Sequence, residues 1–205
     1  MNKRTCLMIS LVTLLASATQ ATQQQLATSI REARTEATRT SEQLKATLDA
    51  LNALAKQTQG DLRPAYNAFA AEIPKTEAAA TWTRTRVTWM ASDGRQYFKS
   101  WQATIDGIAN ESLRKKAQKR LNNVRGDYDK VEVALQKAGD KFRPFLSDLS
   151  DIKRTLATDI TPGGVKAIRS TVTSANWNHK FVNTAINSAL KGMDKMEKSL
   201  STEVK

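Results

Sequence analysis

Apolar residues recur three and four positions apart through most of the chain, and this spacing predicts long helices with one continuous apolar face. The clearest series lies between Leu113 and Leu156. Its apolar positions are Leu121, Val124, Tyr128, Val131, Leu135, Ala138, Phe142, Phe145, Leu149, Ile152 and Leu156. A helix of this length would extend about 67 Å at about 1.5 Å per residue, so its apolar face requires helical partners of similar length.

The same spacing predicts three such partners. With the helix at about 112–158, they lie at about 22–58, 64–109 and 162–201. Gly60 and Pro64 suit the first connection, Asn110 or Ser112 suits an N-cap, and Thr161 followed by Pro162 suits the last helix start. Short connections between helices of matched length predict an all-α fold. We expect an elongated antiparallel up-down-up-down four-helix bundle with coiled-coil packing, forming one domain over 22–205.

Two prolines interrupt the predicted helices. Pro74 and Pro144 lie off the apolar face, and the spacing continues beyond both, so each is expected to kink its helix. The alternative is a break with a loop at each proline. Folding the second helix onto the third places Gly94 level with Tyr128 and Ala80 level with Phe142, so that small residues face large ones.

The N-terminus is typical of a secretory signal peptide. Lys3 and Arg4 precede a short apolar run, Leu7 to Ala16, and small residues then offer cleavage after Ala18 or Ala21. We therefore expect residues 1–21 to be a signal peptide and the protein to be exported to a bacterial periplasm or secreted. The only cysteine, Cys6, lies inside this segment, so the mature chain would have no disulfide and no cysteine metal site.

Charge is the main indication of a partner. The formal net charge is +12, from 32 Lys and Arg against 20 Asp and Glu. For an exported protein this favours an acidic envelope component or an anionic lipid surface, with nucleic acid disfavoured. Cations crowd the start of the third helix, where they oppose the helix dipole: Arg114, Lys115, Lys116, Lys119, Arg120 and Arg125. They predict an anion-binding site, and the alternative is an ordinary solvated face.

The single histidine, His179, occupies an apolar-face position of the last helix. The bundle register places it level with Phe142 and with Thr40 and Ser41, where the apolar spacing of the first helix lapses. We expect a buried hydrogen bond from the imidazole to Thr40 or Ser41, forming a polar layer that sets register. A metal or haem site would need partners, and the chain has no second His.

Four aromatic residues lie beside the apolar faces: Trp82 and Trp89 in the second helix, and Trp177 and Phe181 in the fourth. Neighbouring helices are expected to cover part of them. The alternative is an exposed aromatic patch that binds a partner helix or a second copy of the chain.

No catalytic motif is present, and no cofactor or metal is indicated. The pattern therefore favours a non-catalytic binding or envelope-scaffold protein. One alternative is a protein that binds an anionic lipid or an acidic polymer through the basic start of the third helix. The other is a ligand carrier or enzyme that uses the bundle interior near His179.

Several residues carry a resemblance to a known family. They include Ser112-Leu113-Arg114, Leu121, Arg125, Tyr128, Ala138 and Pro144-Phe145-Leu146, with further likeness at 98–108 and at Ala167-Ile168. This pattern resembles an exported bacterial family of coiled-coil proteins of unknown function, of the DUF 2959 type. The resemblance implies a helical fold and export, and it implies no catalytic residue.

Overall fold

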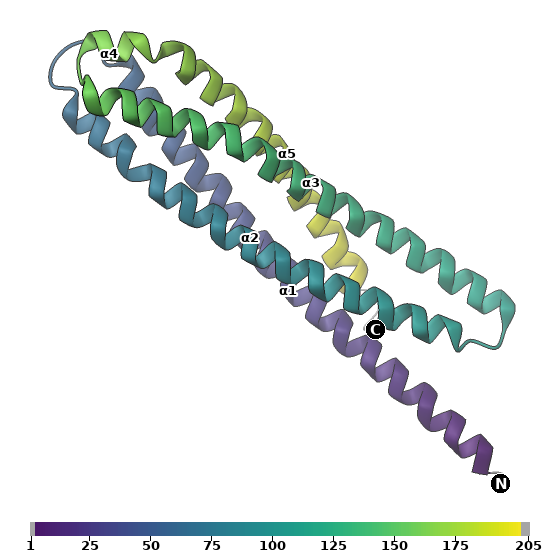
Figure 1. Cartoon of the computed structure of the whole chain (residues 1–205). Coiled ribbons are helices and arrows are strands. Elements are labelled where there is room, and N and C mark those ends of the chain that lie inside the picture. Colours follow the sequence, from purple (N-terminus) through teal and green to yellow (C-terminus); the bar gives the residue numbers. More distant parts are fainter. Residues whose placement is uncertain (1–2, 202–205) are drawn as a thin grey trace. The chain divides into compact units, whose positions relative to one another are not determined.

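The computed structural model describes residues 3–201, and their side chains from residue 18 onward. Its helices are α1 (Lys3–Lys56), α2 (Arg63–Asp106), α3 (Glu111–Thr158), α4 (Pro162–Ala167) and α5 (Arg169–Ser201), as Figure 1 shows. No strand occurs among the described residues, so the predicted all-α class is confirmed. The predicted last helix is divided at Ile168 into α4 and α5, and α1 begins well before the predicted residue 22. The side chains of the predicted signal-peptide run, Leu7 to Ala16, lie outside the described part.

Local sequence explains the helix ends. The Asn110 side-chain oxygen accepts a hydrogen bond from the Leu113 N–H at 3.0 Å, so Asn110 caps α3. Thr161 caps α4 by accepting from the Gly164 N–H at 3.2 Å, with Pro162 in the first turn. Gly60, in the connection after α1, has a φ of 81°, which glycine adopts without steric cost.

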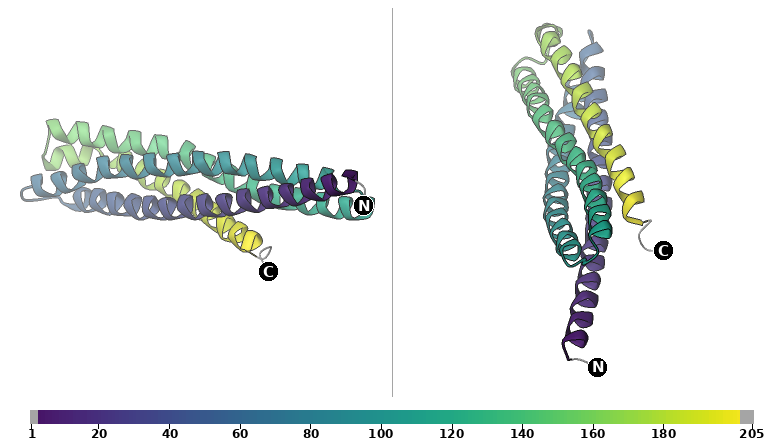
Figure 2. Two further views of the ribbon diagram at one scale, coloured as in Figure 1. Left: turned by 90° about the horizontal axis from the view of Figure 1, so that it is seen from below. Right: turned by 90° about the vertical axis from the view of Figure 1, so that its right-hand side faces the viewer.

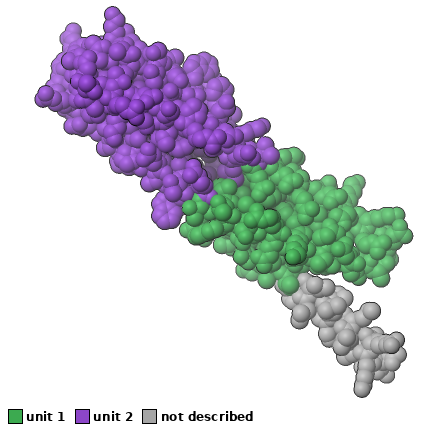
Figure 3. Space-filling view, in the orientation of Figure 1, with its two compact units in different colours: residues 1–34, 85–132, 191–205 green, residues 35–84, 133–190 purple. Residues whose placement is uncertain are grey.

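The chain forms two compact units, coloured separately in Figure 3. Unit 1 comprises Met1–Arg34, Thr85–Glu132 and Lys191–Lys205, and unit 2 comprises Thr35–Arg84 and Val133–Leu190. The boundaries fall inside α1, α2, α3 and α5, so each of these helices contributes to both units. The sequence predicted a single domain, because the apolar spacing continues across all of these boundaries.

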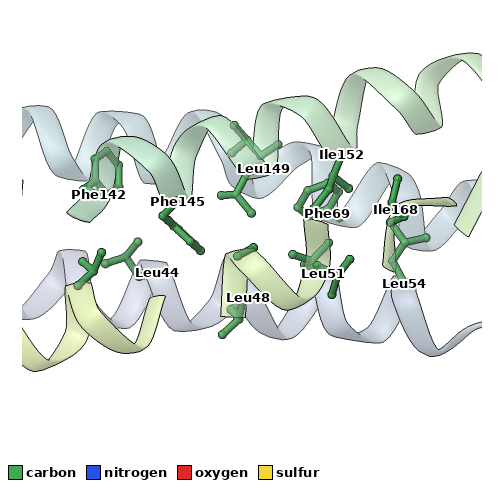
Figure 4. Close-up of a cluster of buried hydrophobic side chains, with 14 of the residues drawn as sticks. Leu44, Leu48, Leu51, Leu54, Phe69, Phe142, Phe145, Leu149, Ile152 and Ile168 are labelled. Carbon is green, nitrogen blue, oxygen red and sulfur yellow. The ribbon is translucent and has the colours of Figure 1, made fainter. Parts of the chain in front are cut away.

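Unit 2 has a contiguous apolar core. In Figure 4, Phe142, Phe145 and Leu149 of α3 lie opposite Leu44 and Leu48 of α1. Phe145, Leu149 and Leu44 are fully buried. Pro74 and Pro144 belong to this unit, and both are exposed inside continuous helices, so the alternative of two broken helices is wrong. The predicted kinks stay a prediction.

In unit 1, two glycines lie directly against side chains of α3. A Cβ added to Gly94 of α2 would lie 2.6 Å from the Tyr128 ring of α3, and one added to Gly192 of α5 would lie 2.6 Å from Val131. The Tyr128 hydroxyl donates to the Met90 carbonyl at 3.0 Å. The predicted pairing of Gly94 with Tyr128 is therefore confirmed.

Cross-helix contacts inside each unit give the direction of neighbouring segments, which lie side by side in Figures 1 and 2. In unit 2, Thr40 and Thr47 of α1 bond to Thr83 and Thr76 of α2 at 2.9 and 2.6 Å. Residue numbers rise on one helix as they fall on the other, so these segments are antiparallel. In unit 1, Gly94 meets Tyr128 and Gln102 bonds to Gln118 at 2.9 Å, so α2 and α3 are also antiparallel there.

Candidate functional site

The basic cluster at the start of α3 is defined here as Arg114, Lys115, Lys116, Lys119 and Arg120, and all five side chains are exposed. Lys115 pairs with Glu111 at 2.7 Å. Within the described part of the chain, no carboxylate lies within ion-pair distance of Arg114, Lys116 or Lys119. The sixth predicted residue, Arg125, has its guanidinium carbon 5.0 Å from the centre of the Phe98 ring. The structure therefore brings five predicted cations together and packs the sixth on an aromatic ring.

Leu113 lies directly beside this cluster. It follows the capping residue Asn110 by three positions and is 56% exposed. The first two turns of α3 therefore present an exposed apolar side chain together with Arg114 and Lys116. Sequence reasoning passed over Leu113, because an isolated leucine at a helix start gives no signal by itself.

The predicted hydrogen bond from His179 is wrong. The Thr40 hydroxyl bonds to Thr83, and the Ser41 hydroxyl donates to the Asn183 side chain at 3.0 Å. Asn183 follows His179 by one helical turn, so α5 is displaced along α1 by about that amount from the predicted register.

His179 instead packs near Phe145, with ring centres 6.0 Å apart, and the ring is half-buried. Burial lowers the pKa of His179, while the Asp49 carboxylate raises it and the Lys45 ammonium lowers it. No group of three or more His, Cys, Asp or Glu residues in the described part of the chain could hold a metal ion.

Polar layers do occur in unit 2, at positions that the sequence did not single out. Thr47 and Thr76 are fully buried and share a 2.6 Å hydrogen bond. The side-chain amides of Asn52 and Asn176 bond to each other in both directions, at 3.1 and 3.0 Å. Thr76 and Thr83 recur seven positions apart in α2, and this recurrence is a signal in the sequence for only one side of the Thr47–Thr76 pair.

The four flanking aromatics are more exposed than expected, at 59% for Trp82, 50% for Trp89, 56% for Trp177 and 48% for Phe181. Trp177 and Phe181 stack, with ring centres 6.2 Å apart. Lys180 lies 5.3 Å from the Trp177 ring centre, and Lys141 of α3 lies 5.6 Å from that of Phe181. These contacts make an aromatic surface with two cations in unit 2, beside a hollow of about 320 Å³ lined by Thr173, Asn176, Trp177 and Lys180.

Trp89 has different surroundings, in unit 1. It lines a hollow of about 350 Å³ between α1 and α2, together with Ala21, Gln24, Gln25, Thr28, Ser29, Glu32 and Asp93. The Arg86 guanidinium lies 4.5 Å from the ring centre of Trp89 and donates to Glu32 at 2.9 Å. Both Trp89 and Trp177 therefore have a cation beside the ring, but only the hollow at Trp89 is also lined by carboxylates. His179 lines neither hollow.

None of the helices in the described part of the chain combines the length and the apolar character that crossing a membrane requires. No curated protein matches the chain. The model of a family of proteins of unknown function, DUF2959, matches residues 16–200, which include every residue of the basic cluster and of both hollows. This match agrees with the resemblance found in the residues of α3. The chain belongs to the DUF2959 family of proteins of unknown function.

Proposed function

We propose that the protein is an exported, non-catalytic binding protein that attaches to an anionic surface of the bacterial envelope through the basic cluster of α3. The single observation that carries this proposal is the exposure of Arg114, Lys116 and Lys119, with no carboxylate within ion-pair distance of them in the described structure. Phosphate or carboxylate groups are the matching chemistry, supplied by anionic lipid or by an acidic polymer.

Folding stability does not account for this cluster. Arg114 lies in the first turn of α3, where a cation interacts unfavourably with the helix dipole. Lys115 and Lys119, and likewise Lys116 and Arg120, are also like-charged pairs four residues apart, each of which costs a helix about 0.2–0.5 kcal/mol. An anionic partner would remove both costs, so the arrangement fits a binding role better than a structural one.

Leu113 favours lipid as the source of the negative charge. An exposed apolar side chain beside cations can enter the boundary between head groups and acyl chains, whereas an acidic polymer offers it no apolar environment. A single leucine contributes about 1.5–3 kcal/mol when fully buried, so it adds to the charge term without replacing it.

The test is co-sedimentation of the mature chain with three kinds of vesicle or bead. We expect pelleting with vesicles that contain phosphatidylglycerol, loss of pelleting at about 0.5 M salt, where the Debye length is only a few ångström, and none with neutral phosphatidylcholine. Pelleting with polygalacturonate beads in place of anionic vesicles would identify a polymer as the source. Equal pelleting with neutral and anionic vesicles, or with neither vesicles nor beads, would refute the proposal.

Export is proposed on the N-terminal sequence, and a contact in unit 1 supports cleavage after Ala18 over cleavage after Ala21. The Thr19 hydroxyl bonds to the Ser100 hydroxyl at 3.0 Å and to that of Thr104 at 2.9 Å. Cleavage after Ala18 keeps these bonds, and cleavage after Ala21 removes them. We expect the intact mass of the periplasmic protein to correspond to a chain that begins at Thr19. A start at Thr22 would overturn this choice, and an uncleaved chain in the cytoplasm would overturn export.

For the fold, we propose the up-down-up-down four-helix topology. It is supported by antiparallel pairs between α1 and α2 and between α2 and α3. In unit 2, the bonds Ser41 to Asn183 and Asn52 to Asn176 add an antiparallel pair between α1 and α5. A ligand site in the interior near His179 is not proposed, because the histidine ring packs on Phe145.

A further inference from the structure

The hollow at Trp89 has the composition of a ligand site that is distinct from the basic cluster. An indole that is 50% exposed lies in a hollow of about 350 Å³ with six side chains that carry hydrogen-bonding groups. All eight lining residues belong to unit 1, with six on α1 and two on α2. A ligand that fits here must offer an apolar face to the indole and hydrogen-bonding groups around its edge.

The indole is held in place before any ligand arrives. The Arg86 guanidinium packs on the Trp89 ring at 4.5 Å and is itself fixed by a 2.9 Å hydrogen bond to Glu32. The Arg86 side chain is only 28% exposed, so it is confined between these two groups. A preformed aromatic platform lowers the entropy cost of binding, which matters most for a weak ligand at an open site.

The edge of the hollow has unused hydrogen-bonding capacity. Gln25 donates to one carboxylate oxygen of Asp93 at 2.8 Å, which leaves the other oxygen of Asp93 and the amide oxygen of Gln25 as acceptors. The side-chain amide of Gln24 is exposed and bonds to none of the described residues, so it supplies both a donor and an acceptor. Together these groups can pair with several hydroxyls on neighbouring atoms of one ligand.

Charge narrows the class of ligand. The Glu32 carboxylate is already paired with the Arg86 guanidinium, so the Asp93 carboxylate is the group that would repel an anionic ligand. The polar edge would leave a wholly apolar ligand with unpaired polar groups beside it. A pyranose ring meets both demands, since one face presents C–H groups and its edge presents hydroxyls. We propose that this hollow binds a neutral saccharide, with one sugar ring stacked on Trp89 and its hydroxyls bonded to Asp93, Gln24 and Gln25.

The hollow at Trp177 supplies a matched control within the same chain. Its indole is similarly exposed, at 56%, and the hollow is of similar volume, about 320 Å³. Lys180 lies by the ring, Phe181 stacks on it, and no carboxylate lines the hollow. A neutral sugar therefore finds an aromatic ring there without the carboxylate edge.

The test is saturation-transfer difference NMR on the mature chain with maltotriose, cellotriose and N,N′,N″-triacetylchitotriose. It is run at about 0.5 M salt, where the attachment of the basic cluster to anions is screened, so that the two proposals fail separately. We expect transfer to the ring C–H protons of at least one sugar. Affinity should fall about tenfold in Trp89→Ala, several-fold in Asp93→Ala, and remain unchanged in Trp177→Ala.

Two results would overturn the proposal. One is the absence of transfer to all three sugars in the unaltered chain. The other is equal transfer in the unaltered chain and in Trp89→Ala, with circular dichroism used to verify that each variant is folded. A loss in Trp177→Ala with retention in Trp89→Ala would place the sugar at the other hollow and would equally refute the assignment.

Discussion

Unit 1 and unit 2 share α1, α2, α3 and α5 and have the same apolar spacing, but they fill their cores in different ways. Unit 2 has a contiguous cluster of leucines and phenylalanines, interrupted by hydrogen-bonded pairs such as Thr47 with Thr76. In unit 1, Gly94 and Gly192 leave room for the Tyr128 and Val131 side chains of α3. One periodic pattern is therefore compatible with two kinds of packing, and in unit 1 the sensitive residues should include these glycines as well as large buried residues such as Leu121.

The largest expected effect is at the centre of the unit 2 core. Phe145 is fully buried, so Phe145→Ala should lower the free energy of unfolding by about 3–5 kcal/mol through lost apolar contact and the cavity left behind. Urea denaturation followed by circular dichroism measures it. Phe181→Ala, at a half-exposed ring of the same unit, is the control and should cost well under half as much. Similar losses in both variants would contradict the assigned core.

The corresponding change in unit 1 adds a methyl group. In Gly94→Ala the new Cβ would lie 2.6 Å from the Tyr128 ring, and we expect a loss of about 1–3 kcal/mol despite the better helix propensity of alanine. Gly139→Ala is the matched control in α3, because no atom lies within 4 Å of its added Cβ. It should stabilise the protein by up to about 1 kcal/mol. A stabilising Gly94→Ala would show that the two helices are not in close contact.

The smallest effect concerns His179 in unit 2. Burial lowers the pKa of His179 in the folded state, so below about pH 6.5 the unfolded chain takes up this proton more readily. The contribution of His179 to stability is therefore fully present above the pKa that the residue has in the unfolded chain. It is lost as the pH falls through the lower pKa of the folded state. We expect a loss of less than about 1 kcal/mol between about pH 7 and pH 5, since solvent screens a half-buried ring.

His179→Gln should flatten that pH dependence in denaturation measured across the same range. A hydrogen bond from Lys75 is the main cause that lowers the pKa of the Glu72 carboxyl. The contribution of Glu72 to stability is therefore lost only at lower pH, outside this range. The same holds for Asp127, whose pKa is lowered by hydrogen bonds from Lys195 and then Lys130. An unchanged slope in His179→Gln would assign the decline to other groups.

Helix caps and short connections could be predicted from the local sequence, whereas the register of α5 against α1 was predicted about one turn away from where it lies. Asn110 and Thr161 were recognisable caps, and the short α2–α3 connection leaves little freedom, so Gly94 was correctly paired with Tyr128. The pairing of α5 with α1 depends on every connection between them. Small offsets at the outer connections add up to about one turn, and Ser41 therefore meets Asn183 in place of His179.

The candidate sites differ in how far the sequence could identify them. The basic cluster is contiguous along the chain, so its residues could be named from the amino-acid sequence alone. The hollow at Trp89 combines residues of α1 with residues of α2, and no local pattern connects Gln25 with Asp93. Trp89 was singled out as an aromatic beside the apolar face, but its polar surroundings depend on how the two helices are aligned.

The central claim is that a local cluster in unit 1, and not the overall positive charge, attaches the protein to an anionic surface. The most direct measurement compares two variants of equal net charge in binding to phosphatidylglycerol vesicles at low salt. In the first variant, Arg114, Lys116 and Lys119 are replaced by glutamine. In the second, glutamine replaces three exposed lysines of unit 2, Lys137, Lys153 and Lys166. We predict about 100-fold weaker binding for the first, from about 1 kcal/mol per cation, and nearly unchanged binding for the second. Equal weakening of both variants would contradict the account.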